Sequence, residues 1–89
     1  MNSRTTRRFR EALRELPDEV RQRARRAYRR FREDPTHPGL RFRRIHTAEP
    51  IYSARIGLRY RALAVVNGDV AVWFWIGTHA DYDRLLETM

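Results

Sequence analysis

The sequence predicts a single α+β domain over residues 1–89, in which an N-terminal helix hairpin packs on a four-stranded antiparallel sheet and a short C-terminal helix follows. Three observations favour this fold class. Apolar residues recur at helical spacing up to about residue 33, and they alternate with polar residues after residue 39. An Asn67-Gly68 pair, typical of a type I′ hairpin turn, separates two apolar segments. Helices followed by strands typically form a sheet with the helices on one face.

The first helix is expected around residues 9–16, where the apolar residues follow the i, i+3, i+4, i+7 pattern. They are Phe9, Ala12, Leu13 and Leu16. Pro17 ends this helix and opens the next, since a proline is tolerated in the first turn. The two helices should therefore form a hairpin around Pro17.

The second helix is expected to run to about residue 33. Asp18 and Glu19 lie in its first turn, where acidic side chains interact favourably with the helix dipole. Asp34-Pro35 ends it, because proline has no amide donor and restricts the residue before it. The apolar stripe of this helix consists of Val20, Ala24, Ala27, Tyr28 and Phe31.

Four strands are expected at residues 40–46, 51–57, 60–66 and 70–77. The last is the most apolar and is expected to lie centrally in the sheet. A short helix is expected after residue 78, with Asp81 near its start. Residues 1–5 are expected to be flexible.

Strand alternation places the side chains on two faces of the sheet. One face is almost wholly apolar and should lie under the helices: Tyr52, Ala54, Ile56, Tyr60, Ala62, Ala64, Val66, Val70, Val72, Phe74 and Ile76. The other carries Ser53, Arg55, Arg61, Leu63, Val65, Ala71, Trp73 and Trp75, with His79 just beyond the last strand. No expected helix covers this second face fully, so it is the candidate functional surface.

The second face suits phosphate chemistry. Arg55 and Arg61, on neighbouring strands, can grip one phosphate through forked hydrogen bonds. Trp73 and Trp75 offer surfaces on which bases stack, at about 1–3 kcal/mol per base. His79 can transfer a proton near neutral pH, because an unperturbed imidazole titrates at about pH 6.5. Together they favour RNA cleavage by 2′-OH attack on the adjacent phosphate, which needs a base, an acid and positive charge.

Each of these residues also has a structural interpretation. Paired tryptophans on a strand are often core or interface residues, and a histidine at a strand end is often simply solvated. The two arginines could instead pair with Asp69, Asp81 or Asp83. The three histidines lack metal-ligand spacing, so no metal site and no cofactor is expected.

Positive charge is concentrated in the first half of the chain. All 19 basic residues are arginine against 11 acidic residues, and residues 1–44 hold 15 of the arginines but six of the acids. Such an excess indicates a polyanionic partner, either nucleic acid or an acidic protein segment. The second helix carries a basic stripe opposite its apolar one: Arg21, Arg25, Arg29 and Arg32. The absence of cysteine, of an apolar run long enough to span a membrane and of a signal-like segment leads us to expect a cytoplasmic protein.

From Phe9 to Leu86 the chain resembles the RelE/ParE superfamily of bacterial toxins from type II toxin–antitoxin modules. The resemblance is carried by the Phe…Leu-Pro helix hairpin, the loop DPTHPGL, the segment RIGLRYRAL and the terminal IGTHADYD. It implies a twisted antiparallel sheet with two N-terminal helices. It also implies one of two activities, since RelE-like members cleave mRNA and ParE-like members poison DNA gyrase. Both kinds are held inactive by an acidic antitoxin.

The resemblance also implies roles by position. Arg61 matches the arginine that RelE-like nucleases use on the scissile phosphate, and Arg55 matches a basic position that binds phosphate or acts as acid or base. His79 matches the histidine of a YafQ-like subset. Tyr82 stands for the terminal aromatic that stacks on a base or transfers a proton, and Ser53 occupies a position that is lysine in RelE-like enzymes.

We therefore expect the toxin of a toxin–antitoxin system that cleaves mRNA without a metal, with Arg55, Arg61, His79 and Tyr82 as catalytic residues. A gyrase inhibitor and an inactive RNA-binding relative are the alternatives. Expected partners are mRNA, with or without the ribosome, and an acidic cognate antitoxin in a toxin–antitoxin hetero-oligomer. The expected RNA-binding residues are Arg43, Arg44, Arg59, Trp73 and Trp75, and the expected antitoxin-binding residues are Arg21, Arg25 and Arg29.

Overall fold

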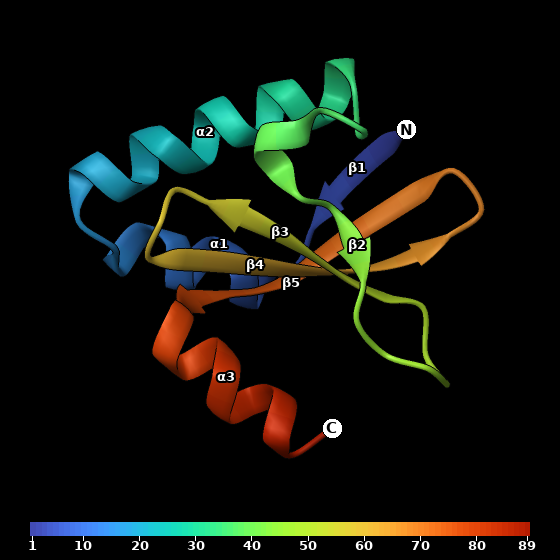
Figure 1. Cartoon of the computed structure of the whole chain (residues 1–89). Coiled ribbons are helices and arrows are strands. Elements are labelled where there is room, and N and C mark those ends of the chain that lie inside the picture. Colours follow the sequence, from blue (N-terminus) through green and yellow to red (C-terminus); the bar gives the residue numbers. More distant parts are fainter.

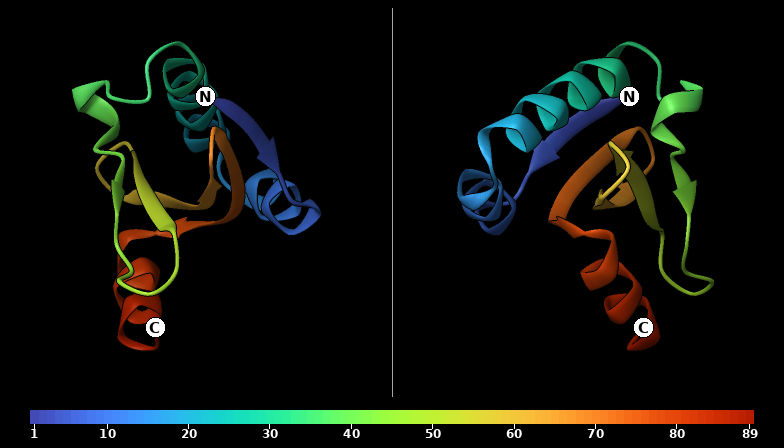
Figure 2. Two further views of the ribbon diagram at one scale, coloured as in Figure 1. Left: turned by 90° about the vertical axis from the view of Figure 1, so that its right-hand side faces the viewer. Right: turned by 60° about the vertical axis from the view of Figure 1, so that its left-hand side comes forward.

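The computed structural model describes residues 1–89 and contains one five-stranded sheet with three α-helices. The elements in chain order are β1 (Asn2–Thr5), α1 (Arg7–Glu15), α2 (Asp18–Glu33), the 3₁₀ turn η1 (Pro38–Leu40), β2 (Arg43–Arg44), β3 (Ile51–Ile56), β4 (Tyr60–Asn67), β5 (Val70–Thr78) and α3 (His79–Glu87). The strand order is β1-β5-β4-β3-β2. Helices α1 and α2 lie on one side of the sheet and α3 on the other (Figures 1 and 2). None of the helices is long and apolar enough to cross a membrane.

The expected helix hairpin is confirmed. Thr6 caps α1, since its hydroxyl oxygen accepts a hydrogen bond from the Phe9 amide at 3.1 Å. Pro17 lies between the helices, and its carbonyl accepts hydrogen bonds from the amides of Val20 and Arg21 in the first turn of α2. After α2, the Asp34 side chain accepts hydrogen bonds from the amide and hydroxyl of Thr36. These bonds lower the pKa of the Asp34 carboxyl below its ordinary value, because they favour its charged form.

The sheet has a fifth strand that the sequence analysis did not expect. Residues 2–5 are not a flexible end but form β1, which pairs parallel with β5, from Asn2 opposite Val70 to Thr5 opposite Trp73. The sheet is therefore mixed. This strand covers an edge of β5 that would otherwise be unpaired, so the most apolar strand lies inside the sheet, as expected. At the opposite edge the expected strand 40–46 shrinks to Arg43–Arg44, since the residues before it turn through η1.

A β-bulge in β5 changes the face that Trp73 occupies. Leu63 of β4 pairs with Trp75, but the next residue, Ala64, pairs with Trp73, which makes Phe74 an extra residue in the ladder. An extra residue reverses the alternation of a strand. The first half of β5 therefore presents to the helices the side chains that simple alternation assigns to the open face.

The expected RNA-binding role of Trp73 is consequently wrong, because Trp73 is a core residue. It is 4% exposed, and its ring meets that of Phe31 edge-on at 5.2 Å between centroids. Its indole N–H donates to the Ser3 hydroxyl of β1 at 2.9 Å. The core between the helices and the sheet consists of Phe9, Ala24, Ala27, Phe31, Leu40, Ala54, Ile56, Ala62, Ala64, Ala71, Trp73 and Ile76.

Candidate functional site

A cleft of about 510 Å³ opens on the sheet face that carries α3. Its walls come from β3, β4, α3, and β2 with the segment that leads into it. They consist of Arg41, Phe42, Arg43, Ser53, Arg55, Arg61, His79, Tyr82, Asp83 and Leu86. All four residues that the sequence analysis proposed as catalytic therefore line one cleft.

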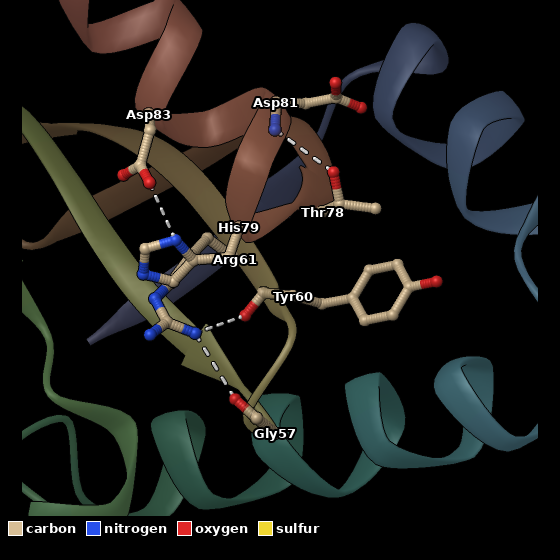
Figure 3. A network of polar contacts seen from close by, with 7 residues as sticks. All are labelled: Gly57, Tyr60, Arg61, Thr78, His79, Asp81 and Asp83. Carbon is tan, nitrogen blue, oxygen red and sulfur yellow. Dashed lines mark hydrogen bonds and ion pairs between the residues drawn. The ribbon is translucent and has the colours of Figure 1, made fainter.

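Two arginines line this cleft, which we call the catalytic cleft after the four residues that are expected to be catalytic. Arg55 and Arg61 lie directly opposite each other in the β3–β4 ladder. Arg61 Nη1 donates to the carbonyls of Tyr60, at 2.8 Å, and Gly57, at 3.3 Å (Figure 3). Arg55 Nε donates to the same Gly57 carbonyl at 3.2 Å. Neither guanidinium forms an ion pair with a carboxylate, so the structural alternative of aspartate partners is not realised.

The charge of this pair is not neutralised by an ion pair. Partial burial lowers the pKa of Arg61 below its ordinary value, and the neighbouring charge of Arg55 lowers it further. Arg61 nevertheless keeps its charge at neutral pH, because a guanidinium loses its proton only in strong base. Like charges directly opposite each other in a sheet repel. A bound anion would relieve this repulsion, and a phosphate matches the forked geometry of two guanidiniums.

His79 begins α3 and is fixed there by its backbone and its ring. Its amide donates to the Arg59 carbonyl at 2.7 Å, and Thr78 caps the helix by accepting from the Asp81 amide. The Nδ1 atom of the ring lies 3.0 Å from Asp83 Oδ2, one helical turn further on (Figure 3). A carboxylate in this position favours the tautomer with hydrogen on Nδ1, which leaves Nε2 free to accept a proton.

Aromatic side chains support the start of α3. Tyr82 is 6% exposed, and its ring lies 5.9 Å from that of His79 and 6.5 Å from that of Trp75, between centroids. Trp75 packs over Gly77 and does not line the catalytic cleft. Leu63, on the same sheet face, is fully buried. Helix α3 thus covers more of this face than the sequence analysis expected.

The other expected RNA-binding residues divide between the catalytic cleft and the surface outside it. Arg43 lines the cleft. Arg44 donates instead to the carbonyls of His46 and Thr47, and Arg59 is exposed outside the cleft.

The sequence analysis missed two polar residues of the cleft. Arg41 has a left-handed backbone conformation, with φ of 45°, and no local sequence pattern predicts its position in the cleft. Asp83 could have been found, because its position four residues after His79 on a helix brings the two side chains together.

The expected antitoxin-binding residues lie in two different places. Arg25 and Arg29 lie beside a groove of about 470 Å³ between α1 and α2, whose apolar members include Phe9, Leu13 and Tyr28. Arg21 lies outside this groove: it pairs with Asp18 and donates to the Arg14 carbonyl of α1 at 2.9 Å. It therefore ties the two helices together. We call the groove beside Arg25 and Arg29 the helix groove.

No group of three or more histidine, aspartate or glutamate side chains is arranged to hold a metal ion. The polar side-chain groups that line the catalytic cleft are guanidinium, imidazole, phenol, carboxylate and the hydroxyl of Ser53.

Comparisons with known proteins agree with this fold. A chain of the RelB–RelE antitoxin–toxin complex from Methanococcus jannaschii superposes with a TM-score of 0.73 at 20% sequence identity, over 91% of this chain and 96% of that one. The archaeal RelE–RelB complex from Pyrococcus horikoshii gives 0.70 at 18% identity, over 86% and 92%. YafQ from E. coli gives 0.68 at 9% identity, over 91% and 96%. A comparison with curated protein sequences finds no match.

The sequence itself matches a family model. Residues 18–84, most of the chain, match the model described as a ParE-like toxin domain, and this segment extends from the start of α2 into α3. Because the match covers most of the chain, with strands β2 to β5 and all but one of the residues of the catalytic cleft, this chain belongs to the ParE-like toxin family of the RelE/ParE superfamily.

Proposed function

We propose that this toxin is an endoribonuclease of the cytoplasm that cleaves mRNA in the catalytic cleft. One observation carries the proposal: Arg55 and Arg61, without carboxylate partners, share a cleft with a histidine whose ring is oriented by Asp83. A phosphate would supply the charge that the two arginines lack. A gyrase inhibitor has no need of a proton-transfer group beside such a pair.

In the proposed reaction, Nε2 of neutral His79 takes the proton of a 2′-OH. The 2′-oxygen then attacks the adjacent phosphorus and forms a phosphorane with more negative charge than the phosphodiester. Arg55 and Arg61 stabilise that added charge preferentially, which accelerates the step. The bond to the 5′-oxygen breaks, and this oxygen takes a proton for which Tyr82 is the candidate donor. The products are a 2′,3′-cyclic phosphate and a 5′-OH.

The test is primer extension on cellular mRNA after induction of the wild type, Arg61→Ala and His79→Ala. Loss of one donor to the developing charge typically lowers the rate by about 10²–10³-fold, and loss of a proton-transfer group by about 10²–10⁴-fold. Arg8→Ala is the matched control, since Arg8 is exposed on α1 and outside the cleft. If the wild type creates no new 5′ ends but traps cleaved DNA together with gyrase, the ParE-like activity replaces the nuclease.

We also propose that an acidic antitoxin binds this toxin at the helix groove. The two archaeal relatives compared above are toxin–antitoxin complexes. The helix groove combines apolar walls with Arg25 and Arg29, which suits a segment with apolar and acidic side chains that folds on binding. Co-purification with a small acidic protein encoded beside the toxin tests this partner, and a harmless toxin expressed alone would contradict it.

A further inference from the structure

A second basic pocket lies between α2, η1 and the turn that joins β3 to β4. Its volume is about 520 Å³, and it contains four arginines and no acidic side chain. We call it the α2 pocket, and it is lined by Arg23, Arg26, Ala27, Arg30, Gly39, Leu40, Arg55, Gly57 and Leu58. Neither the predictions from the sequence nor the proposed chemistry uses this pocket.

The positive charge of the α2 pocket is mostly unpaired. Arg26 and Arg30 are exposed and form no ion pair, whereas Arg23 pairs with Glu19. A Cβ atom at Gly39 would lie 3.8 Å from Arg30 Nη1. A Cβ atom at Gly57 would lie 3.3 Å from Cδ of Arg23. Gly57 therefore leaves room for the Arg23 side chain to lie against the backbone of the pocket wall, whereas the distance at Gly39 is that of an ordinary van der Waals contact.

Arg55 joins the α2 pocket to the catalytic cleft, because it lines both. Strand β2 pairs with β3 only at Tyr52 and Ser53, so the end of β3 that carries Arg55 has no neighbour on that side. Arg55 therefore lies between the two pockets at this open edge. The two pockets thus form a continuous basic path around the end of β3.

We propose that the α2 pocket is a second phosphate site for the RNA strand that enters the catalytic cleft. The cleft would hold the scissile phosphate and Arg26 and Arg30 a second backbone phosphate of the same strand, so this inference rests on the proposed nuclease function. A groove of positive charge that follows the backbone is how compact proteins hold single strands. An acidic peptide would also need apolar anchors, which the helix groove offers and the α2 pocket, with only Ala27, Leu40 and an exposed Leu58, largely lacks.

The test measures binding of a labelled single-stranded RNA of about ten nucleotides. The 2′-OH groups of this RNA are methylated so that it cannot be cleaved. Each phosphate contact to a single strand contributes about 0.7 to the slope of log affinity against log salt. Arg26 and Arg30 hold a single phosphate in this proposal, so the double variant Arg26→Gln/Arg30→Gln should lower the slope by about 0.7. Between 50 and 200 mM salt, its affinity should fall about 2.6-fold less than that of the wild type.

The matched control is Arg8→Gln/Arg32→Gln, which removes the same charge from exposed positions outside the catalytic cleft, the helix groove and the α2 pocket. It should leave the slope near the wild-type value. An equal loss in both double variants would mean that only net charge matters, and it would overturn the inference. A double variant at Arg26 and Arg30 that keeps its RNA slope but loosens antitoxin binding would show a peptide site instead. If the double variant does not fold, Arg30→Gln alone replaces it and should lower the slope by half as much.

Failure of this inference is distinct from failure of the proposed function. A wild type that cleaves RNA, together with an unchanged slope in the double variant, would refute the second phosphate site and keep the nuclease. A wild type that cleaves nothing, together with the reduced slope, would refute the nuclease and keep the phosphate site.

Discussion

The packing of Trp75 over Gly77 allows a prediction about how the Trp75 ring stabilises the start of α3. A Cβ atom built on Gly77 would lie 2.7 Å from a carbon of the Trp75 ring, closer than real side chains approach. The backbone of Gly77 has no positive φ, so an alanine there would be unstrained apart from this contact. Gly77→Ala should therefore destabilise the protein only through steric overlap, which displaces the indole ring of Trp75.

The expected loss is about 1–3 kcal/mol, the usual range for overpacking in a well-packed site. For a domain of this size that loss lowers Tm by roughly 5–20 °C. Because the Trp75 ring contacts Tyr82 beside His79, RNA cleavage should fall as well. Calorimetry and the cleavage assay measure the two effects on the same preparation.

A double-mutant cycle separates the clash from other causes. In a Trp75→Leu background the ring is gone, so Gly77→Ala should cost little, and the coupling energy should be about 1 kcal/mol or more. Gly68→Ala is the contrasting control: nothing lies within 4 Å of its Cβ position, but its φ is 59°. That substitution should lose about 1–2 kcal/mol through backbone strain, whatever stands at position 75. Equal losses from Gly77→Ala with and without the tryptophan would refute the reasoning.

Three further predictions follow from the structure. Trp73→Ala should destabilise the protein by about 3–5 kcal/mol, since Trp73 is a core residue, and a near-neutral effect in denaturant unfolding would restore the RNA-binding interpretation. Asp83→Asn should lower kcat of RNA cleavage by about 10–100-fold with little change in KM, because Asp83 orients His79 and does not bind substrate; an effect on KM alone would contradict this role. Arg25→Gln/Arg29→Gln should weaken the antitoxin complex in pull-down titrations while cleavage by the free toxin persists; intact antitoxin binding would exclude the helix groove.

Patterns within short segments explain what could be predicted from the sequence. The helix hairpin depends on the stripe through Phe31 and on Pro17, and the β4–β5 hairpin depends on Asn67-Gly68. The catalytic cleft followed from the same local information. Alternation in β3 and β4 places Arg55 and Arg61 on one face, and the end of β5 places His79 beside them.

What could not be predicted depends on partners far away in the chain. The polar segment of residues 2–5 has no apolar alternation and becomes a strand because β5 offers it an edge, about 70 residues later. The bulge at Phe74 is equally hidden, since a run of apolar residues reads the same with or without one extra residue. That single extra residue places Trp73 on the core face of the sheet, and Trp73 is therefore not the RNA contact that the sequence predicts.

The arrangement of charge explains why the proposed ligand carries several negative charges and not a single one. The ion pairs within α2 join Arg21 to Asp18 and Arg23 to Glu19, and the two acidic side chains are largely exposed. Around the end of β3 no carboxylate forms an ion pair with Arg55 or Arg61, although repulsion between these two arginines opposes folding. A bound phosphate backbone would relieve this repulsion, because it supplies a regular series of negative charges beside the arginines.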